Sequence, residues 1–269
     1  MDAASKPPVD GRTALVTGST SGIGAAIADA LERAGARVIR HGLEPVGHAG
    51  RPSLAEDLAI VGAGARLASA ARDVGPVDIL VHSASVQIRE PWLSITAEQM
   101  ERQLRVNLVA FLELVQGIAP DMAERRWGRI LAIGSVQQAR PHPEMAAYAA
   151  SKAAQANLVS NLAKQLAPRG VTVNSLSPGV IDTPRNRDAL ASDEYHRRVV
   201  GQIPLGRIGT PADCVPLALL LCSDDGGYIP AATSRSTAAT CSSGATTREG
   251  GGGQCPRDSL TAAAAAMTS

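Results

Sequence analysis

The sequence predicts an α/β fold in which helices cover both faces of a doubly wound parallel sheet. Short aliphatic or β-branched runs alternate along the chain with longer segments rich in alanine and leucine, as in successive βαβ units. The short runs are apolar almost throughout, which is typical of strands that are buried on both faces. The chain has 269 residues, enough for one large domain of this kind.

The individual elements follow from the order of these patterns. The expected strands are 13–17, 36–41, 78–82, 129–135 and 171–177. The expected helices lie at about 22–34, 98–125, 145–167 and 211–223. The segment 43–57 contains two prolines and two glycines, so we expect a short or irregular connection there instead of a full helix.

Charge and cysteine content narrow the function classes. The formal net charge is +1 and charges of both signs are interspersed, so we expect neither a nucleic-acid nor a membrane partner. No segment resembles a signal peptide or approaches the roughly 20 apolar residues of a membrane span. We therefore expect a cytoplasmic protein that acts on a small molecule. The cysteines form no C-x-x-C pair, which predicts reduced thiols and no metal site: Cys214, Cys222, Cys241 and Cys255.

A glycine-rich turn follows the first expected strand. In "LVTGSTSGIGAAIADAL", Gly18, Gly22 and Gly24 stand between a strand and a helix. Glycines allow backbone N–H groups to approach a pyrophosphate, which the helix N-terminus then stabilises. The alternative is that these glycines only form the turn, but their position between strand and helix favours a dinucleotide site.

Tyr148 and Lys152 form a second candidate site in "YAASKAAQANL". They are four residues apart on an expected helix and therefore share a face. An ammonium group close to a phenol stabilises the phenolate, so the pair can exchange a proton with an alcohol oxygen. The alternative is a half-buried tyrosine and a solvated lysine on an ordinary helix.

Ser135 ends the expected strand 129–135. The carboxyl ends of strands in an open α/β sheet border the crevice that binds ligands. The Ser135 hydroxyl can therefore donate to a carbonyl oxygen there, although on its own it is only a serine that follows a strand.

Together these motifs resemble the short-chain dehydrogenase/reductase family. T-G-x-x-x-G-x-G at Thr17–Gly24, Asn107, Ser135, Tyr148-x-x-x-Lys152 and "SPGVIDTP" at 177–184 stand in the family's order and approximate spacing. The resemblance extends from about residue 9 to residue 229. It implies a Rossmann-type domain and an oxidoreductase that transfers a hydride between a nicotinamide cofactor and a carbonyl or secondary alcohol.

The resemblance also implies a role for each matching residue. Tyr148 is the acid–base, Ser135 holds the substrate oxygen, and Lys152 lowers the pKa of the tyrosine and binds the nicotinamide ribose. Asn107 supports a water-linked proton relay. The residues expected to contact the cofactor are Gly18, Ser21, Gly22, Ile23, Gly24, Arg40, His41, Asp57, Ala84, Tyr148, Lys152, Pro178, Gly179, Ile181 and Thr183.

The end of the second expected strand bears on the choice of cofactor. Members that prefer NAD carry an acidic residue there, whereas this chain has Gly42, preceded by Arg40 and His41. The missing acid and the nearby positive charge favour NADP(H). NAD(H) remains open, because Ser21 stands where many NADP-dependent members place an arginine. The family usually has the motif N-N-A-G after the fourth strand, whereas this chain has "HSAS" at 82–85. We expect the first residue of this segment, His82, to be a packed polar residue.

The substrate is not specified by the sequence. The resemblance extends to 3-oxoacyl-[acyl-carrier-protein] reductases and to sugar or polyol dehydrogenases. Four arginines of the expected lid, 184–204, are candidates for contact with an anionic substrate or carrier, although a solvated lid helix is the alternative: Arg185, Arg187, Arg197 and Arg198. A competing function is that of a non-catalytic dinucleotide-binding regulatory protein on the same fold.

The composition changes in "YIPAATSRSTAAT", which extends from Tyr228 to Thr240. After Ile229 the chain loses all apolar periodicity, so composition alone predicts a disordered tail. Members of the resembled family normally have a last strand of the type T-G-x-x-[IV]-x-V-D-G-G at this point. If one base is restored ahead of Pro230, the first two bases of each present codon become the second and third bases of a codon in the restored frame. These bases permit the sequence "TGGDISVDGGN", which has that pattern.

We interpret the chain from Pro230 onward as the product of a one-base deletion or a sequencing error, with a natural disordered tail as the alternative. This interpretation divides the chain into a dinucleotide-binding and catalytic domain, 1–229, and an aberrant low-complexity tail, 230–269. It predicts that the last edge strand is missing, which leaves 171–177 as an apolar edge. The resemblance implies a homo-oligomer, a tetramer or a dimer, whose interface this loss affects.

Overall fold

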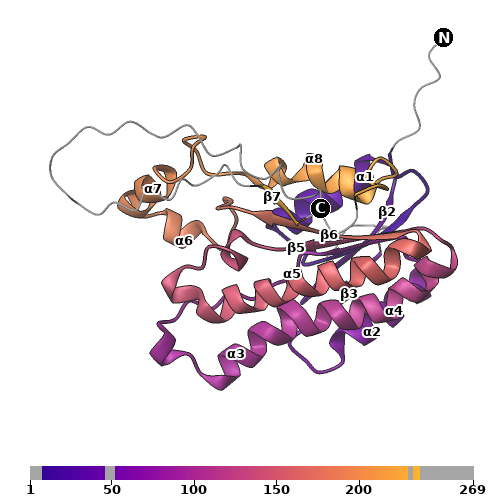
Figure 1. Cartoon of the computed structure of the whole chain (residues 1–269), viewed down its shortest axis with the longest axis horizontal. Coiled ribbons are helices and arrows are strands. Elements are labelled where there is room, and N and C mark those ends of the chain that lie inside the picture. Colours follow the sequence, from indigo (N-terminus) through magenta and orange to yellow (C-terminus); the bar gives the residue numbers. More distant parts are fainter. Residues whose placement is uncertain (1–7, 46–51, 230–232, 237–269) are drawn as a thin grey trace, which may run out of the picture.

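The computed structural model describes residues 8–45, 52–229 and 233–236 (Figure 1). Its centre is a seven-stranded parallel sheet with the strand order β3-β2-β1-β4-β5-β6-β7. The prediction of a doubly wound parallel sheet is therefore confirmed. The strands are β1 Thr13–Thr17, β2 Arg37–Gly42, β3 Ser53–Ala55, β4 Ile79–His82, β5 Gly128–Ile133, β6 Val171–Pro178 and β7 Thr233–Ser236.

Helices cover both faces of this sheet (Figure 1). One face packs against α2, α4 and α5, and the other packs against α1 and α8. The short helices α6 and α7 lie beyond the end of β6, in the expected lid. The helices are α1 Gly22–Arg33, α2 Ala63–Val74, α3 Ala97–Leu104, α4 Ala110–Glu124, α5 Ala146–Leu166, α6 Arg187–Leu190, α7 Asp193–Val200 and α8 Pro211–Cys222.

The two hydrophobic cores arise from alternation along the strands. Leu15 and Leu80 point into the core beneath α2, α4 and α5. Val16 and Val81, their neighbours in sequence, point into the core beneath α1 and α8. Successive side chains of a strand face opposite sides, so each buried strand contributes to both cores.

The expected helix 98–125 contains an irregular turn. It consists of α3, a π-helical turn at Arg105–Val109 and α4. By length and composition alone, Ala97–Glu124 is apolar enough to cross a membrane, but Phe111, Leu114 and Ile118 on it are buried in the core. Its apolar character is that of a core helix, and its π turn carries Asn107.

The sequence did not predict α2, and it predicted wrongly that the last edge strand is missing. Thr233–Ser236 forms β7, which pairs with β6 in the register Ser175↔Thr233 to Pro178↔Ser236. A parallel ladder is made by main-chain groups, so even a polar segment can form one. The remainder of the proposed tail, 230–232 and 237–269, lies outside the described residues.

The strand register brings the carboxyl ends of the central strands together. Thr17 on β1 is level with His82 on β4, and His82 is level with Ala132 on β5. The residues that follow these strands therefore lie along one edge of the sheet. This is the edge at which open α/β sheets bind their ligands.

Candidate active site

A cavity of about 360 Å³ opens at this edge, between the ends of the strands and the segment that follows β6. Fourteen of the predicted site residues line it, whereas Lys152 and Asn107 are fully buried nearby without lining it. Among the described residues, no group of three or more His, Cys, Asp or Glu side chains is placed to hold a metal ion. The lining residues are Gly18, Ser21, Gly22, Ile23, Gly24, His41, Asp57, Ala84, Ser135, Tyr148, Pro178, Gly179, Ile181 and Thr183.

The glycine-rich turn packs too closely for side chains. A Cβ at Gly18 would lie 2.7 Å from the Cα of Ala84, and the φ angle of Gly18 is +63°. A Cβ at Gly24 would lie 2.2 Å from the carbonyl oxygen of Gly18. Glycine at both positions therefore lets α1 begin directly against the end of β4.

The N-terminus of α1 borders the cavity. Ser21 precedes the helix, and its side chain makes no capping hydrogen bond to the first helical amides. Unpaired N–H groups at the start of a helix carry a partial positive charge and favour a bound anion. This end of the cavity suits a phosphate group.

His41 ties the glycine-rich turn to the loop after β3. The N–H of Gly18 donates to Nδ1 of His41 at 3.3 Å, and Nε2 of His41 lies 3.0 Å from the carbonyl oxygen of Glu56. Burial lowers the pKa of His41, so the neutral imidazole donates from Nε2 and accepts at Nδ1. His41 thus supports the cavity wall as a neutral group.

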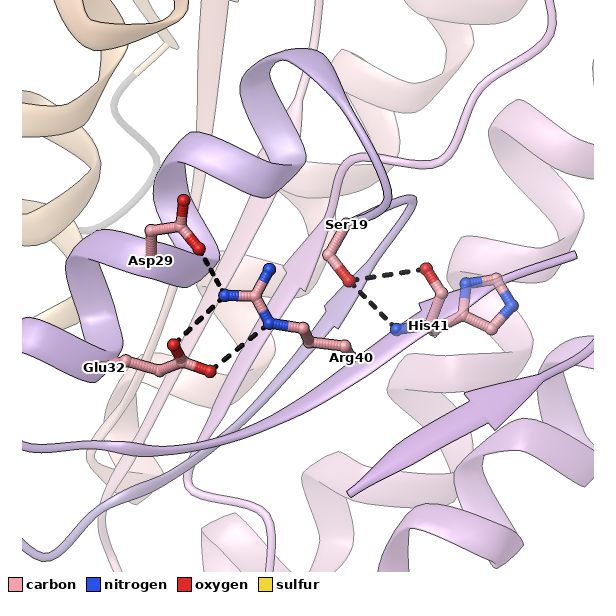
Figure 2. Close-up of polar contacts among 5 residues, drawn as sticks. All are labelled: Ser19, Asp29, Glu32, Arg40 and His41. Atoms are coloured by element: carbon pink, nitrogen blue, oxygen red, sulfur yellow. Dashed lines mark hydrogen bonds and ion pairs between the residues drawn. The ribbon is translucent and has the colours of Figure 1, made fainter. Parts of the chain in front are cut away.

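Arg40 points away from the cavity, so the prediction that it contacts the cofactor is wrong. Its guanidinium donates to both carboxylate oxygens of Glu32, at 3.3 and 3.1 Å, and also to Asp29. Both partners belong to α1, and Figure 2 shows the Arg40 and His41 side chains on opposite sides of β2. The reason is strand alternation: His41 lines the cavity, so its neighbour faces the core beneath α1.

The acidic residues after β3 also border the cavity. Asp57 lines it, and one carboxylate oxygen of Asp57 accepts a hydrogen bond from the N–H of Ala59 at 2.9 Å. Glu56 lines it as well and is paired with Arg66 at 2.6 Å. The structure therefore places Asp57 at the cavity, and its contact with the cofactor stays a prediction.

Tyr148 and Ser135 meet at the opposite end of the cavity. Tyr148 lies in the first turn of α5 and is 5% exposed, and the hydroxyl of Ser135 lies close enough to its phenol to affect the pKa of the phenol. Burial raises the pKa of Tyr148, while the charge of Arg185 and the neighbouring hydroxyl of Ser135 act in the opposite direction. The phenol therefore keeps its proton at neutral pH and faces the cavity beside a second hydroxyl.

Lys152 lies one helical turn beyond Tyr148, with Nζ 6.0 Å from the centre of the phenol ring. Nζ donates to the carbonyl oxygen of Ile133 at 2.7 Å and to Oε1 of Gln155 at 3.1 Å. Burial, with a further contribution from the charge of Arg185, lowers the pKa of Lys152 to about 7. The ammonium form is therefore held in place by neutral acceptors.

Asn107 uses its side chain to join three parts of the chain. Its Oδ1 accepts from the N–H of Val86 at 2.8 Å, and its Nδ2 donates to the carbonyl of Val86 and to Oγ of Ser151, both at 2.9 Å. Its main-chain carbonyl accepts from Nε2 of Gln155 at 2.6 Å. Asn107 thus fixes the segment after β4 against α5.

His82 is a packed polar residue, as the sequence predicts. It is completely buried, its Nδ1 lies 3.1 Å from Oγ1 of Thr17, and its ring stacks on Phe111 at 5.4 Å. Burial, assisted by the charge of Lys152, lowers the pKa of His82 to about 3. The ring is therefore neutral at physiological pH.

Arg185 spans the front of the cavity. Its guanidinium donates to Oγ and to the carbonyl oxygen of Ser85, at 2.8 and 2.6 Å. This contact links the segment after β6 to the segment after β4, 100 residues earlier in the chain. Both partner atoms are neutral, so Arg185 places a positive charge at the cavity close enough to affect Tyr148 and Lys152.

Comparison with known proteins agrees with this geometry. Residues 18–235 match the family model described as enoyl-(acyl carrier protein) reductase. The 3-oxoacyl-[acyl-carrier-protein] reductase FabG of Aquifex aeolicus is 34% identical over an alignment of 237 residues that covers 82% of this chain and 94% of that protein.

Two solved structures share the fold over most of this chain. A 3-oxoacyl (acyl-carrier-protein) reductase from Agrobacterium tumefaciens C58 with NADP bound has a TM-score of 0.83 and 41% identity, covering 89% of this chain and 98% of that chain. A gluconate 5-dehydrogenase from Burkholderia cenocepacia J2315 in complex with NADP and tartrate has a TM-score of 0.82 and 28% identity, covering 87% and 96%.

Proposed function

The chain belongs to the short-chain dehydrogenase/reductase family and is an oxidoreductase, and we propose that it reduces a carbonyl group with NADPH or catalyses the reverse oxidation. One observation carries the proposal: Tyr148 and Ser135 line the same cavity that borders the N-terminus of α1. A proton donor and a phosphate site thus share one cavity.

The residues around the cavity fit a dinucleotide. The close packing at Gly18 and Gly24 leaves main-chain N–H groups at the cavity, and the start of α1 carries a partial positive charge. When bound, the nicotinamide supplies or accepts the hydride. The cofactor-holding roles of the lining residues are part of this proposal.

Support for NADP(H) comes from the end of β2. Gly42 lines the cavity at the position where an acidic side chain would repel a 2′-phosphate. The hydroxyl-bearing Thr20 and Ser21 line the same region and are candidates to hold that phosphate, in place of Arg40. The solved relatives described above also carry NADP.

The direction of proton transfer follows from the environment of Tyr148. Because burial raises its pKa, Tyr148 holds a proton that it donates to the carbonyl oxygen during reduction. The hydroxyl of Ser135 positions that oxygen through a second hydrogen bond. The ammonium of Lys152 stabilises the phenolate that remains, because an opposite charge nearby favours the ionised form.

A 3-oxoacyl thioester is the first substrate class to test, because the relatives named as 3-oxoacyl-[acyl-carrier-protein] reductases match nearly the whole chain. A hydroxy acid is the second class. Arg185 favours it, since among the described residues its hydrogen-bond partners are the neutral atoms of Ser85, and its positive charge would pair with a carboxylate. A cytoplasmic location and a homo-oligomeric state, dimer or tetramer, are further parts of the proposal, supported by the family resemblance alone.

Initial rates with a two-part substrate panel test the function. NADPH oxidation with acetoacetyl-CoA and NADP⁺ reduction with gluconate, each repeated with the non-phosphorylated cofactor, separate the two substrate classes and the two cofactors. We expect turnover with NADPH and the thioester. Folded protein that binds NADPH but turns over neither class would contradict the enzyme proposal and support the non-catalytic alternative.

A further inference from the structure

A glutamine occupies the space between Lys152 and Asn107. Gln155 lies on α5 and is completely buried. Its Oε1 accepts from Nζ of Lys152 at 3.1 Å, and its Nε2 donates to the main-chain carbonyl of Asn107 at 2.6 Å. One carboxamide therefore connects the lysine to the π turn that carries Asn107.

We propose that Gln155 is a positioning residue that holds Lys152 in its charged form beside Tyr148. This inference deepens the proposed function and rests on it. The two acceptors of Lys152, Gln155 and Ile133, are both neutral oxygens.

The chemistry of the carboxamide fits this positioning role. A carboxamide oxygen accepts a hydrogen bond, but it does not take up a proton at neutral pH. The carbonyl oxygens of Ile133 and Asn107 behave in the same way. The network Lys152–Gln155–Asn107 therefore orients the ammonium without taking up its proton.

The other groups that face Lys152 do not stabilise its charge. His82 on β4 is neutral, and Tyr148 on α5 keeps its proton at neutral pH. Arg185, after β6, is positive and lowers the pKa of Lys152 further. The hydrogen bond from Gln155 thus opposes both burial and Arg185, and its removal should lower the pKa of Lys152.

A direct measurement is possible because the chain contains only three lysines: Lys6, Lys152 and Lys164. Protein labelled with ¹³C at the lysine Cε gives three side-chain signals, which Lys6→Arg and Lys164→Arg variants assign. Titration without cofactor then reports the pKa of Lys152 independently of any activity. The exposed Lys164 on the same helix serves as an internal reference.

The informative pair of variants is Gln155→Met and Gln155→Glu. Methionine fills the same space without an oxygen, and we expect the pKa of Lys152 to fall by about one unit. Glutamate keeps an oxygen that faces Lys152, so the pKa should stay at or above the wild-type value whether or not the glutamate is ionised. Gln165→Met, an exposed glutamine on the same helix, is the matched control and should change nothing.

The second measurement is the pH dependence of kcat/KM, and in particular the pH at which kcat/KM falls on the alkaline side. If turnover needs the ammonium form, Gln155→Met lowers this pH, whereas Gln155→Glu does not. A Lys152 pKa that stays within about 0.3 units of wild type in Gln155→Met would overturn the inference. Gln155→Leu replaces Gln155→Met if the latter fails to show a cooperative thermal melt. An inactive wild-type protein would count against the proposed function, while the lysine titration still decides the role of Gln155.

Discussion

A side chain at position 42 would place its Cβ only 2.4 Å from Cγ2 of Thr20. The methyl group of Thr20 therefore occupies the space that an acidic residue at the end of β2 would need. The main chain of Glu44 is also close, because its carbonyl oxygen would lie 3.2 Å from that Cβ. Gly42 and Thr20 therefore fit together, and an acidic side chain at position 42 requires a smaller residue at position 20.

The first prediction concerns cofactor choice. Gly42→Asp combined with Thr20→Ser should shift the ratio of kcat/KM for NADPH over NADH at least about tenfold toward NADH, because the carboxylate repels a 2′-phosphate and binds a 2′-hydroxyl. Steady-state kinetics with both cofactors measure this ratio. Thr20→Ser alone is the control and should leave it unchanged. An unchanged ratio in the double variant would show that position 42 does not face the ribose.

The second prediction concerns Arg40. Its guanidinium is 3% exposed and pairs with Glu32 and Asp29, which are 17% and 50% exposed. Arg40→Leu should lower the free energy of unfolding by about 1–3 kcal/mol, because the ion pairs of the buried Arg40 with Glu32 and Asp29 are lost. The KM for NADPH should stay within about twofold of wild type, since this side chain faces α1. Urea denaturation and steady-state kinetics measure the two effects.

Arg37→Leu, on the same strand, is the control for that experiment. Arg37 is exposed, and its guanidinium donates to the carbonyl oxygen of Val74, a neutral partner, so its loss should cost less stability than the loss of Arg40. A tenfold or larger rise in the KM for NADPH in Arg40→Leu would restore the assignment of Arg40 to the cofactor site.

The third prediction concerns acid stability and His82. In the folded chain the pKa of His82 is about 3, against an ordinary value of 6.5, so between these pH values the unfolded chain binds a proton that the folded chain does not. Stability contributed by this group is present above pH 6.5 and is lost as the pH falls toward 3, by about 1.4 kcal/mol per pH unit. His82→Asn should therefore show a shallower loss of unfolding free energy across this range.

Urea denaturation at several pH values tests the His82 prediction. His142→Asn provides a comparison, because His142 lies outside the core and bonds only to its local turn. Parallel pH curves for wild type and His82→Asn would mean that the ring can be protonated without unfolding.

The main elements of the fold could be predicted because they depend on local signals. The turn between β1 and α1 is marked by glycines that leave no space for a Cβ, and the central strands are apolar on both faces. Helix α2 was missed because its buried face consists mainly of alanine and glycine, with Leu67 as its single large apolar residue. The direction of Arg40 could have been inferred from the alternation with His41 along β2.

The residues of the site that the sequence missed depend on contacts between distant segments. Gln155 could have been found, because it lies three residues after Lys152 and therefore shares its helix face. The contact between Arg185 and Ser85 spans 100 residues and has no local signal. Strand β7 could not be predicted from composition, because main-chain groups form its ladder with β6.

The fourth prediction concerns the reading frame. β7 occupies Thr233–Ser236, where the restored frame would encode Asp-Ile-Ser-Val in place of Thr-Ser-Arg-Ser. Resequencing the gene should reveal the missing base ahead of Pro230. The corrected protein should melt about 5 °C or more above the present chain, because the restored strand adds apolar residues beside β6. In-frame DNA through this region, with equal melting temperatures, would support a natural tail.

The account depends most directly on Tyr148 as the proton donor, and turnover by Tyr148→Phe tests this. Phenylalanine keeps the ring beside Lys152 but removes the hydroxyl that lies beside Ser135 at the cavity. With the substrate that wild type turns over, kcat should fall by about 10²-fold or more. The Kd for NADPH should stay within about twofold, since the cavity wall is otherwise intact. Turnover equal to wild type, at equal NADPH affinity, would show that another group donates the proton.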